Sequence, residues 1–287
     1  MESTGGSATH VDDRVVLIMG APRSGTSLTC ALLGRLDDTV ALIEPFTNRR
    51  LVAPGSREGA IEVIAEFVRR TRRRALREGV VISKHEGGAL YDNSGDAVRR
   101  GERVTRGVIE VGKPLSDDFT LCVKENPGFT ALLPELAEQF RCVAIVRNPL
   151  ATVLSQASIE FAVAPGAIGL AHQLDQNLWE AYQRIDDPID RRIFTLRWYH
   201  ERYATSLPSD AVVRYEDIVA SRGRALAAVT PRAAALDEDL ESRNERARGD
   251  VATFTERLLA APPSPFYSPA DVEALATAIR SSAPAAD

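Results

Sequence analysis

A short stretch between Gly20 and Gly25 combines residue types that can bind a phosphate group. The apolar run Val15 to Met19 leads into it, and apolar residues at helical spacing follow from Leu28. The two glycines allow a tight turn, and the free N–H groups at the start of a helix attract an anion. Arg23 adds a permanent, planar cation. The hydroxyl donors of the stretch are Ser24, Thr26 and Ser27. The pattern predicts a phosphate-binding loop between a buried strand and a helix.

The loop differs from a Walker A loop at one decisive position. Thr26 and Ser27 follow Gly25 directly, so the lysine that a Walker A loop places after its last glycine is absent. This departure disfavours hydrolysis of ATP or GTP. The alternative is an ordinary strand-to-helix turn that happens to be rich in Ser and Gly.

Polar side chains also follow the other predicted strands. Glu44 comes directly after Thr39 to Ile43, Lys124 after residues 119–123, and Arg147 after residues 141–146. Ser155 lies eight residues beyond Arg147, on a helix that we expect to begin at Pro149. Residues beyond the carboxyl ends of parallel strands face the ligand crevice of an open α/β sheet. These side chains should therefore face whatever the loop holds, although Glu44 alone is also compatible with an exposed carboxylate at a strand end.

The order of predicted elements indicates an α/β fold, with a P-loop-type central parallel sheet flanked by helices. Residues 1–13 are predicted to be a disordered leader, and 14–287 a single α/β domain. Within it, 83–118 is predicted to be an irregular, partly mobile insertion, and 231–287 a part that is helical in pieces. The other predicted elements are helices at 58–79, 129–139, 172–186 and 189–206, a strand at 211–215 and a helix start at 268–271.

One predicted helix is rich in arginine. The segment 69–77 contains six arginines, and we interpret the run as a solvated helix face, with a patch for an acidic substrate as the alternative. His85 falls in the predicted insertion, where we expect a loop histidine and not a base.

Composition excludes several classes of function. The chain has 287 residues, 44% of them hydrophobic and 26% charged, which is ordinary for a globular protein. A net charge of −5 argues against a nucleic-acid partner. No apolar stretch approaches 18 residues and the first residues do not resemble a signal peptide, so we expect a cytoplasmic protein without a membrane partner. We expect the three cysteines to be reduced core residues. The chain has only three lysines: Lys84, Lys113 and Lys124.

Three segments together resemble the sulfotransferases that use 3′-phosphoadenosine 5′-phosphosulfate (PAPS). Residues 22–27 look like the loop that binds the 5′-phosphosulfate in that family. Arg147-Asn148-Pro149 with Ser155 resembles its 3′-phosphate motif, including the spacing. Arg214 to Asp217 resembles the segment whose tyrosine, here Tyr215, lies near the adenine. The order of the three motifs over about 200 residues makes the resemblance specific.

The resemblance also implies site residues and a reaction. Glu44-Pro45 is similar to the base segment of the tyrosylprotein and carbohydrate branch, so it implies that Glu44 is the general base of a soluble bacterial relative. Lys124 would stabilise the charge that develops on the leaving phosphate oxygen, and Arg23 would be a further catalytic cation. Asn126 stands where another branch has its catalytic histidine. Arg248 loosely matches the arginine of a C-terminal segment that contacts the 3′-phosphate.

The expected donor is PAPS, and we expect no metal. The acceptor would be a hydroxyl of a small molecule, a sugar or a peptide, and neither its identity nor the oligomeric state can be predicted. The alternatives are a P-loop kinase that uses ATP and Mg²⁺, and a noncatalytic nucleotide-binding protein.

Overall fold

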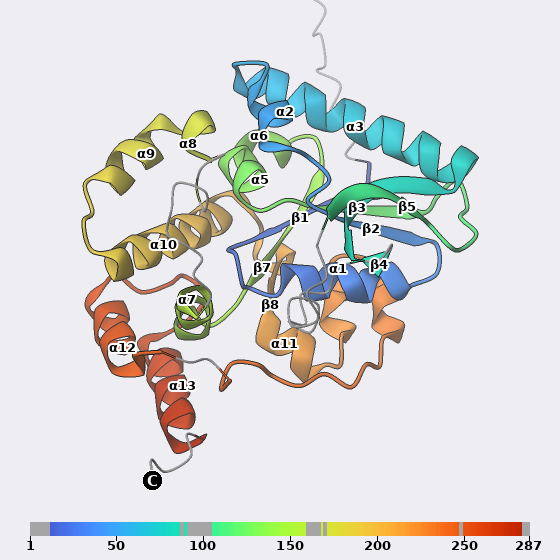
Figure 1. Ribbon diagram of the computed structural model, residues 1–287. Coiled ribbons are helices and arrows are strands. Elements are labelled where there is room, and N and C mark those ends of the chain that lie inside the picture. Colours follow the sequence, from blue (N-terminus) through green and yellow to red (C-terminus); the bar gives the residue numbers. More distant parts are fainter. Residues whose placement is uncertain are drawn as a thin grey trace, which may run out of the picture.

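The computed structural model describes residues 12–86, 89–90, 105–158, 168, 171–246 and 249–282. A five-stranded sheet at its centre has the strand order β2-β6-β1-β7-β8, and every pair is parallel (Figure 1). Its strands are β1 (Val15–Gly20), β2 (Thr39–Ile43), β6 (Thr120–Lys124), β7 (Arg141–Val146) and β8 (Val212–Arg214). The predicted fold class, a parallel sheet flanked by helices, is confirmed.

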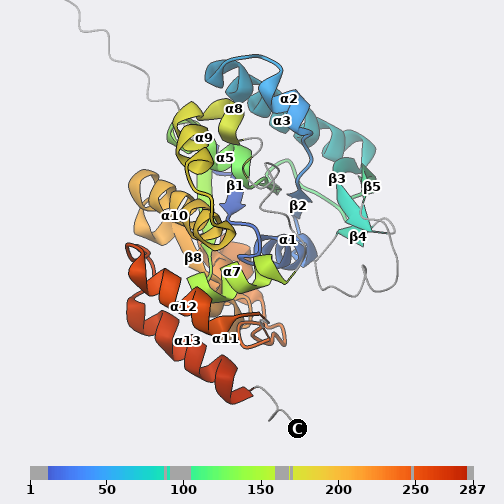
Figure 2. The ribbon, with the colours of Figure 1, turned by 60° about the vertical axis from the view of Figure 1, so that its left-hand side comes forward.

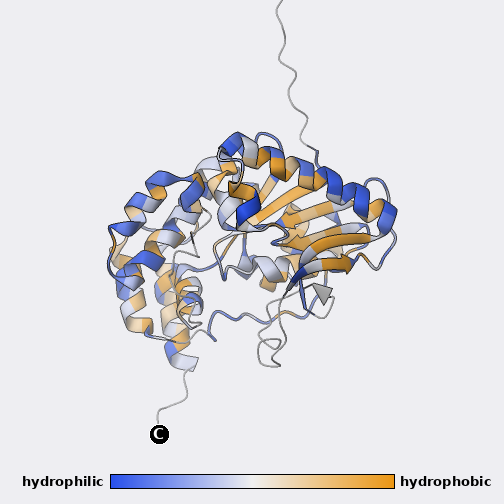
Figure 3. Ribbon diagram, turned by 45° about the horizontal axis from the view of Figure 1, so that its top comes forward, coloured by the Kyte–Doolittle hydropathy of each residue, from blue (hydrophilic) through white to orange (hydrophobic). Residues whose placement is uncertain are grey.

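Both faces of this sheet are buried, which explains why its strands are apolar without alternation. In β1, Val15, Leu17 and Met19 point into one core, and Val16 and Ile18 point into the other. Figure 3 shows the resulting run of hydrophobic strands between helices of mixed hydropathy. A strand buried on both faces reads as a continuous apolar run, so the sequence identifies these strands well.

Helices cover the two faces. In Figures 1 and 2, α1 and α11 lie below the sheet and α3 and α5 above it, and Figure 1 shows α6 on the upper side as well. On the lower side are α1 (Thr26–Arg35), α11 (Tyr215–Ala220) and the 3-10 helices η2 (Arg224–Ala228) and η3 (Pro231–Ala235). The upper side and the flank carry α2 (Asn48–Val52), α3 (Arg57–Glu78), α5 (Pro127–Ala131), α6 (Leu133–Leu136), α7 (Pro149–Ala157), α8 (Ala171–Leu174), α9 (Gln176–Gln183) and α10 (Pro188–Ser206). The short η1 (Ser209–Ala211) precedes β8, and α12 (Val251–Ala260) and α13 (Pro269–Ser282) end the described chain.

A second sheet occupies the region predicted to be an irregular insertion. It has the order β4-β3-β5 and is antiparallel, with β3 (Val80–Glu86), β4 (Ala89–Leu90) and β5 (Thr105–Glu110). The prediction for 83–118 is wrong for these described segments, because charged and small residues at the strand ends conceal a long-range pairing. The Ser83 hydroxyl accepts a hydrogen bond from the Ile43 N–H at 2.9 Å, which joins β3 to the free edge of β2.

Other predicted boundaries differ in smaller ways. The predicted helix at 129–139 is two short helices, and Pro134 lies in the first turn of α6. A proline is tolerated there but cannot continue a preceding helix. The C-terminal part is helical in pieces as predicted, with a stretch without helix between η3 and α12. The segment predicted to be a leader lies outside the described residues, except for Asp12 and Asp13.

Most of the arginines on α3 form ion pairs or hydrogen bonds with other residues of the chain. Arg69 and Arg73 lie within ion-pair distance of Glu66, at 3.0 and 3.8 Å, and Arg74 pairs with Glu78 at 2.9 Å. Arg72 donates to the Phe119 carbonyl at 2.7 Å. The contacts fit the interpretation as a solvated helix face. Among the helices of the described residues, none has the length and apolar character needed to cross a membrane.

Candidate functional site

The predicted loop follows β1, the middle strand of the parallel sheet. Arg23 and Gly25 both have left-handed backbone angles, with φ of 75° and 98°, and the Ser24 N–H donates to the Ala21 carbonyl at 3.0 Å. A Cβ atom at Gly20 would lie 2.5 Å from the Ser24 hydroxyl oxygen and 2.6 Å from the Ile145 carbonyl oxygen. The tight turn therefore needs glycine at this position, and it presents the start of α1 at the carboxyl edge of the sheet.

On the β7–β8 side of the loop, predicted residues from three motifs meet. The Arg23 guanidinium donates to the Ser155 hydroxyl at 3.0 Å, and Arg147 donates to the Arg23 carbonyl at 3.0 Å and to the Asn244 side-chain oxygen at 2.7 Å. The Arg147 guanidinium also lies over the Tyr215 ring, 4.7 Å from its centre. We call these five residues the Arg147 cluster.

The charge of Arg147 is not neutralised by a direct ion pair. The residue is 7% exposed, and within the described part of the chain no carboxylate lies within 4.0 Å of its guanidinium. Burial lowers the pKa of Arg147, but a guanidinium stays protonated in proteins. Asn244 separates the cation from Glu216, because its amide N–H donates to the Glu216 carboxylate at 2.8 Å. A buried cation with neutral partners is costly unless a ligand supplies an anion.

Tyr215 is a packing residue as well as a candidate ligand. It is 4% exposed, and its ring covers Gly25 so closely that a Cβ there would lie 2.7 Å from a ring carbon. Its hydroxyl accepts from the Arg243 N–H at 3.1 Å. The neighbouring Glu216 accepts from the Asn148 N–H at 3.0 Å. These contacts join the loop, the start of α7 and the segment before α12.

On the β2–β6 side of the loop, Glu44 lies between two lysines. The Lys124 ammonium is 2.5 Å from one carboxylate oxygen, and the Lys84 ammonium is in contact with the other. Arg106, on β5, donates to the Glu44 carbonyl at 2.7 Å. We call these four residues the Glu44 cluster. The predicted meeting of Glu44 and Lys124 is found in the structure, and the antiparallel sheet adds two further cations.

The cations decide the protonation of Glu44. Burial disfavours its charged form, but the attraction of Lys124 and then of Lys84 outweighs burial and lowers the pKa of Glu44 to about 2. The neighbouring Glu125 shows the opposite effect, since burial and the charge of Glu44 raise its pKa to about 7. This happens although Glu125 accepts from the Gly128 N–H at 2.8 Å. Two adjacent carboxyl groups therefore differ in charge state because only one of them contacts cations.

The remaining predicted residues have mixed positions. The Ser24 hydroxyl and the side-chain oxygen of Asn126 are buried without a hydrogen-bond partner in the described structure. Thr26 is buried and Ser27 partly buried at the start of α1. His85 lies on β3, with its ring 3.4 Å from the Thr105 hydroxyl, so it is a strand residue and not the expected loop histidine. Arg248 lies outside the described residues.

Sequence reasoning missed four residues of this edge. Lys84 carried a signal, because it is one of only three lysines, but nothing in its neighbourhood indicated β3. Glu216 lies within the recognised Tyr-Glu-Asp segment, where only the tyrosine received a role. Arg106 and Asn244 gave no signal, since both reach the site through long-range contacts.

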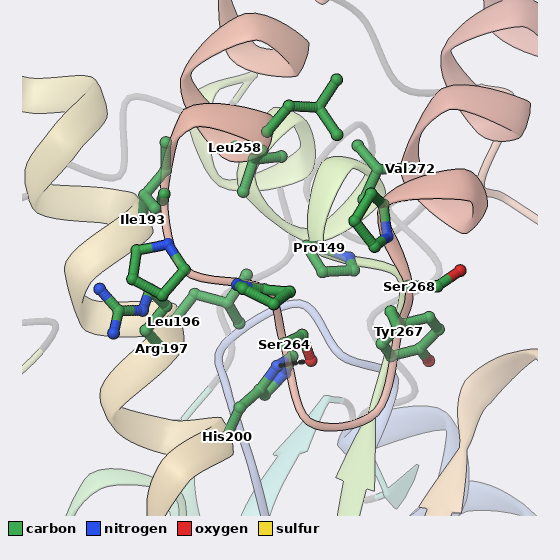
Figure 4. A pocket seen from close by; sticks show the side chains of 15 residues that line it. Pro149, Ile193, Leu196, Arg197, His200, Leu258, Ser264, Tyr267, Ser268 and Val272 are labelled. Carbon is green, nitrogen blue, oxygen red and sulfur yellow. Dashed lines mark hydrogen bonds between the residues drawn. The ribbon is translucent and has the colours of Figure 1, made fainter.

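A separate cavity of about 70 Å³ lies between α10, α12 and α13 (Figure 4). Its wall is mainly apolar, with residues such as Leu196, Leu258 and Val272. His200 donates to or accepts from the Ser264 hydroxyl at 2.8 Å at this cavity, and burial lowers the pKa of His200 to about 3. Pro149, which follows Arg147 and Asn148, lines this cavity, but none of the predicted catalytic or binding residues that the structure describes does.

Comparisons with known proteins identify no family for the chain. No protein-family model matches it, and no curated protein matches it. Among solved structures it is similar to the sulfotransferase domain from the Synechococcus PCC 7002 olefin synthase, with 16% identity and a TM-score of 0.37 over 95% of this chain and 89% of that one. At this identity and TM-score the likeness assigns no activity to this chain.

The expectation that no metal takes part stays a prediction. In the part of the chain that the structure describes, no group of three His, Cys, Asp or Glu side chains could hold a metal ion. The expectation that the reaction needs no metal is not tested by this observation.

Proposed function

We propose that the chain is a sulfotransferase that moves a sulfuryl group from PAPS to an acceptor hydroxyl. The observation that carries the proposal is the buried Arg147 cation, whose contacts in the described structure are all neutral and which lies against the loop. A nucleotide with a 3′-phosphate would supply the missing anion. ADP and ATP lack that group, so Arg147 would select the donor.

The residues at this edge fit such a donor. The loop, with the free Ser24 hydroxyl and the start of α1, would hold the 5′-phosphosulfate. Arg147 and Ser155 would hold the 3′-phosphate, which requires the Ser155 hydroxyl to be shared with Arg23. Tyr215 would hold the phosphate-binding loop in place, because its ring already packs against Gly25. We also propose that Arg248 contacts the 3′-phosphate.

The Glu44 cluster would perform the chemistry on the other side of the loop. The acceptor oxygen attacks sulfur, the bond from sulfur to the 5′-phosphate oxygen breaks, and the acceptor proton passes to Glu44. The products are a sulfate ester and 3′-phosphoadenosine 5′-phosphate. Lys124 would stabilise the negative charge that develops on the leaving oxygen. Such a base contributes about 10² to 10⁴ in rate.

A thermal-shift titration with 3′-phosphoadenosine 5′-phosphate tests the proposal. Ligand at about 100 times its dissociation constant should stabilise the fold by roughly 2.7 kcal/mol. We expect this nucleotide to stabilise the wild type, ADP to do so much less, and Arg147→Met to lose the response. Arg141→Met is the matched control, because Arg141 begins β7, the strand that Arg147 follows, and donates to the Ala228 carbonyl at 2.7 Å.

Other outcomes would favour the alternatives. Preferential stabilisation by ATP with Mg²⁺ would replace the proposal with a kinase. Tight binding of the 3′-phosphorylated nucleotide without turnover of PAPS on a panel of phenols, sugars and tyrosine peptides would favour a noncatalytic nucleotide-binding protein.

A further inference from the structure

The Glu44 carboxylate is held more firmly than a free general base would be. Lys124 contacts one oxygen at 2.5 Å, and Lys84 contacts the other. The backbone is held as well, since the Glu44 N–H donates to the Lys124 carbonyl at 2.7 Å and Arg106 donates to the Glu44 carbonyl. Glu44 also has a left-handed φ of 42°, which a residue other than glycine adopts at a cost. The surrounding contacts thus fix both its position and its charge.

A base in this state accepts a proton poorly. General bases work best when their pKa is near the operating pH, and an acceptor hydroxyl must come within hydrogen-bond reach of a carboxylate oxygen. Two ammonium groups in contact oppose both requirements. One of the two lysines must therefore leave the carboxylate before Glu44 can act.

The two lysines differ in their freedom to leave. The Lys124 side chain is 4% exposed and belongs to β6, which lies between β2 and β1. Separation from Glu44 would leave its ammonium buried and unpaired, which is strongly unfavourable. The Lys84 side chain is 35% exposed and belongs to β3 in the separate sheet. Lys84 can therefore exchange its ion pair for water at a much smaller cost.

The antiparallel sheet makes the departure of Lys84 easier still. Lys84 lies directly opposite Arg106 in the β3–β5 register. Like charges at directly opposite positions of two paired strands repel each other. Glu44 contacts both of them and compensates the repulsion. The backbone of β3 stays in place meanwhile, because Ser83 is fully buried and accepts from the Ile43 N–H.

Besides the two lysines, the cation Arg106 contacts the Glu44 carbonyl, and the other ionisable groups that interact with Glu44 are mostly neutral. Burial raises the pKa of Cys30, on α1, to about 12, and burial also raises the pKa of Tyr199, on α10. Glu125, after β6, has its pKa raised to about 7 by burial and then by Glu44. The charges that lower the pKa of Glu44 are therefore the two lysines in contact with it.

From this geometry we infer that Lys84 is a positioning residue that sets the proton affinity of Glu44, and that Lys84, not Lys124, leaves the carboxylate when an acceptor hydroxyl enters. The role of Glu44 as base rests on the proposed function. The ion-pair exchange itself is a property of the free protein and can be measured without an acceptor.

The first test is a titration of the Glu44 carboxyl by carbon-13 NMR in the full chain. Glu44→Gln assigns the signal. We expect no Glu44 titration above pH 4 in the wild type and an upward shift of at least one pH unit in Lys84→Met, restored by Lys84→Arg. Lys113→Met is the charge-matched control, since Lys113 donates to the Gly34 carbonyl at 2.7 Å, away from this cluster. An unchanged titration in Lys84→Met would overturn the inference.

The second test asks which lysine separates more readily. Reductive methylation of the full chain, followed by peptide mass spectrometry, reads all three lysines individually. We expect Lys84 to react at least ten times faster than Lys124, and Glu44→Gln to accelerate Lys84 further. Faster reaction of Lys124 would overturn the inference.

The outcomes separate the inference from the proposed function. Binding of 3′-phosphoadenosine 5′-phosphate by Lys84→Met, measured by thermal shift, should equal that of the wild type. If the nucleotide binds but Glu44 titrates at the same pH in the wild type and in Lys84→Met, only the inference fails. If the nucleotide stabilises neither protein while the titration shifts, only the proposed function fails.

Discussion

The two clusters at the carboxyl edge of the sheet hold charge in opposite ways. In the Glu44 cluster, one carboxylate contacts two lysines, so its negative charge is more than compensated. In the Arg147 cluster, a buried cation contacts an amide oxygen, a carbonyl oxygen and an aromatic ring, and its nearest link to a carboxylate passes through Asn244. The Arg147 cluster therefore lacks an anion before any ligand binds, whereas the Glu44 cluster must lose a contact before it can react. The loop after β1 separates the two.

The largest effect should come from a substitution that changes the Glu44 cluster alone. Glu44→Gln keeps the shape of the side chain but removes its charge and its ability to accept a proton. We expect turnover of PAPS to fall by about 10²- to 10⁴-fold, while the affinity for 3′-phosphoadenosine 5′-phosphate changes little. Turnover like that of the wild type, measured with any acceptor that the wild type uses, would remove Glu44 from the role of base.

A smaller effect should come from a substitution that disturbs the packing of Tyr215 in the Arg147 cluster. Gly25→Ala places a Cβ at 2.7 Å from the Tyr215 ring, at a φ of 98° that alanine adopts poorly. We expect a loss of about 3 kcal/mol in the free energy of unfolding, from overpacking and backbone strain together. Nucleotide affinity should fall as well.

Denaturant unfolding and the same thermal-shift titration measure the two losses in Gly25→Ala. Gly112→Ala is the control for a positive φ without a neighbour, because a Cβ there meets nothing within 4 Å. Equal losses in the two variants would show that the contact with Tyr215 is unimportant.

The smallest effect concerns Glu125, which lies beside the Glu44 cluster but outside it. Burial and then Glu44 raise its pKa to about 7, above the ordinary value of 4.5, so the folded state binds the proton more tightly than the unfolded state. Its contribution to stability is present below pH 4.5 and declines as the pH rises through 7. As the pH rises from 5 to 8, the wild type loses stability that Glu125→Gln keeps. The free energy of unfolding of Glu125→Gln should therefore rise by about 2 kcal/mol relative to that of the wild type over this range.

Denaturant unfolding at several pH values checks the prediction for Glu125. The glutamine oxygen can still accept from the Gly128 N–H, so the fold should be retained. A stability difference between wild type and Glu125→Gln that does not change with pH would contradict the raised pKa.

The parallel half of the fold was predictable because local pattern and tertiary environment agree there. Apolar runs such as 15–19 and 141–146 are buried on both faces, and the turn residues between strand and helix mark the loop. The antiparallel sheet was not predictable in the same way. Lys84 and Arg106 look like surface residues of a loop until β3 and β5 pair across an intervening segment of the chain.

The sequence by itself determined the strand order along the chain, the loop, and the positions of Glu44, Lys124, Arg147 and Ser155 at strand ends or just beyond them, because these follow from local patterns and spacing. Only the tertiary structure decided how these side chains are charged and paired. Lys84 reaches Glu44 across 40 residues and Asn244 reaches Arg147 across 97. Charge state depends on burial and on neighbours within a few ångströms, and chain folding brings those neighbours from segments that no local pattern connects.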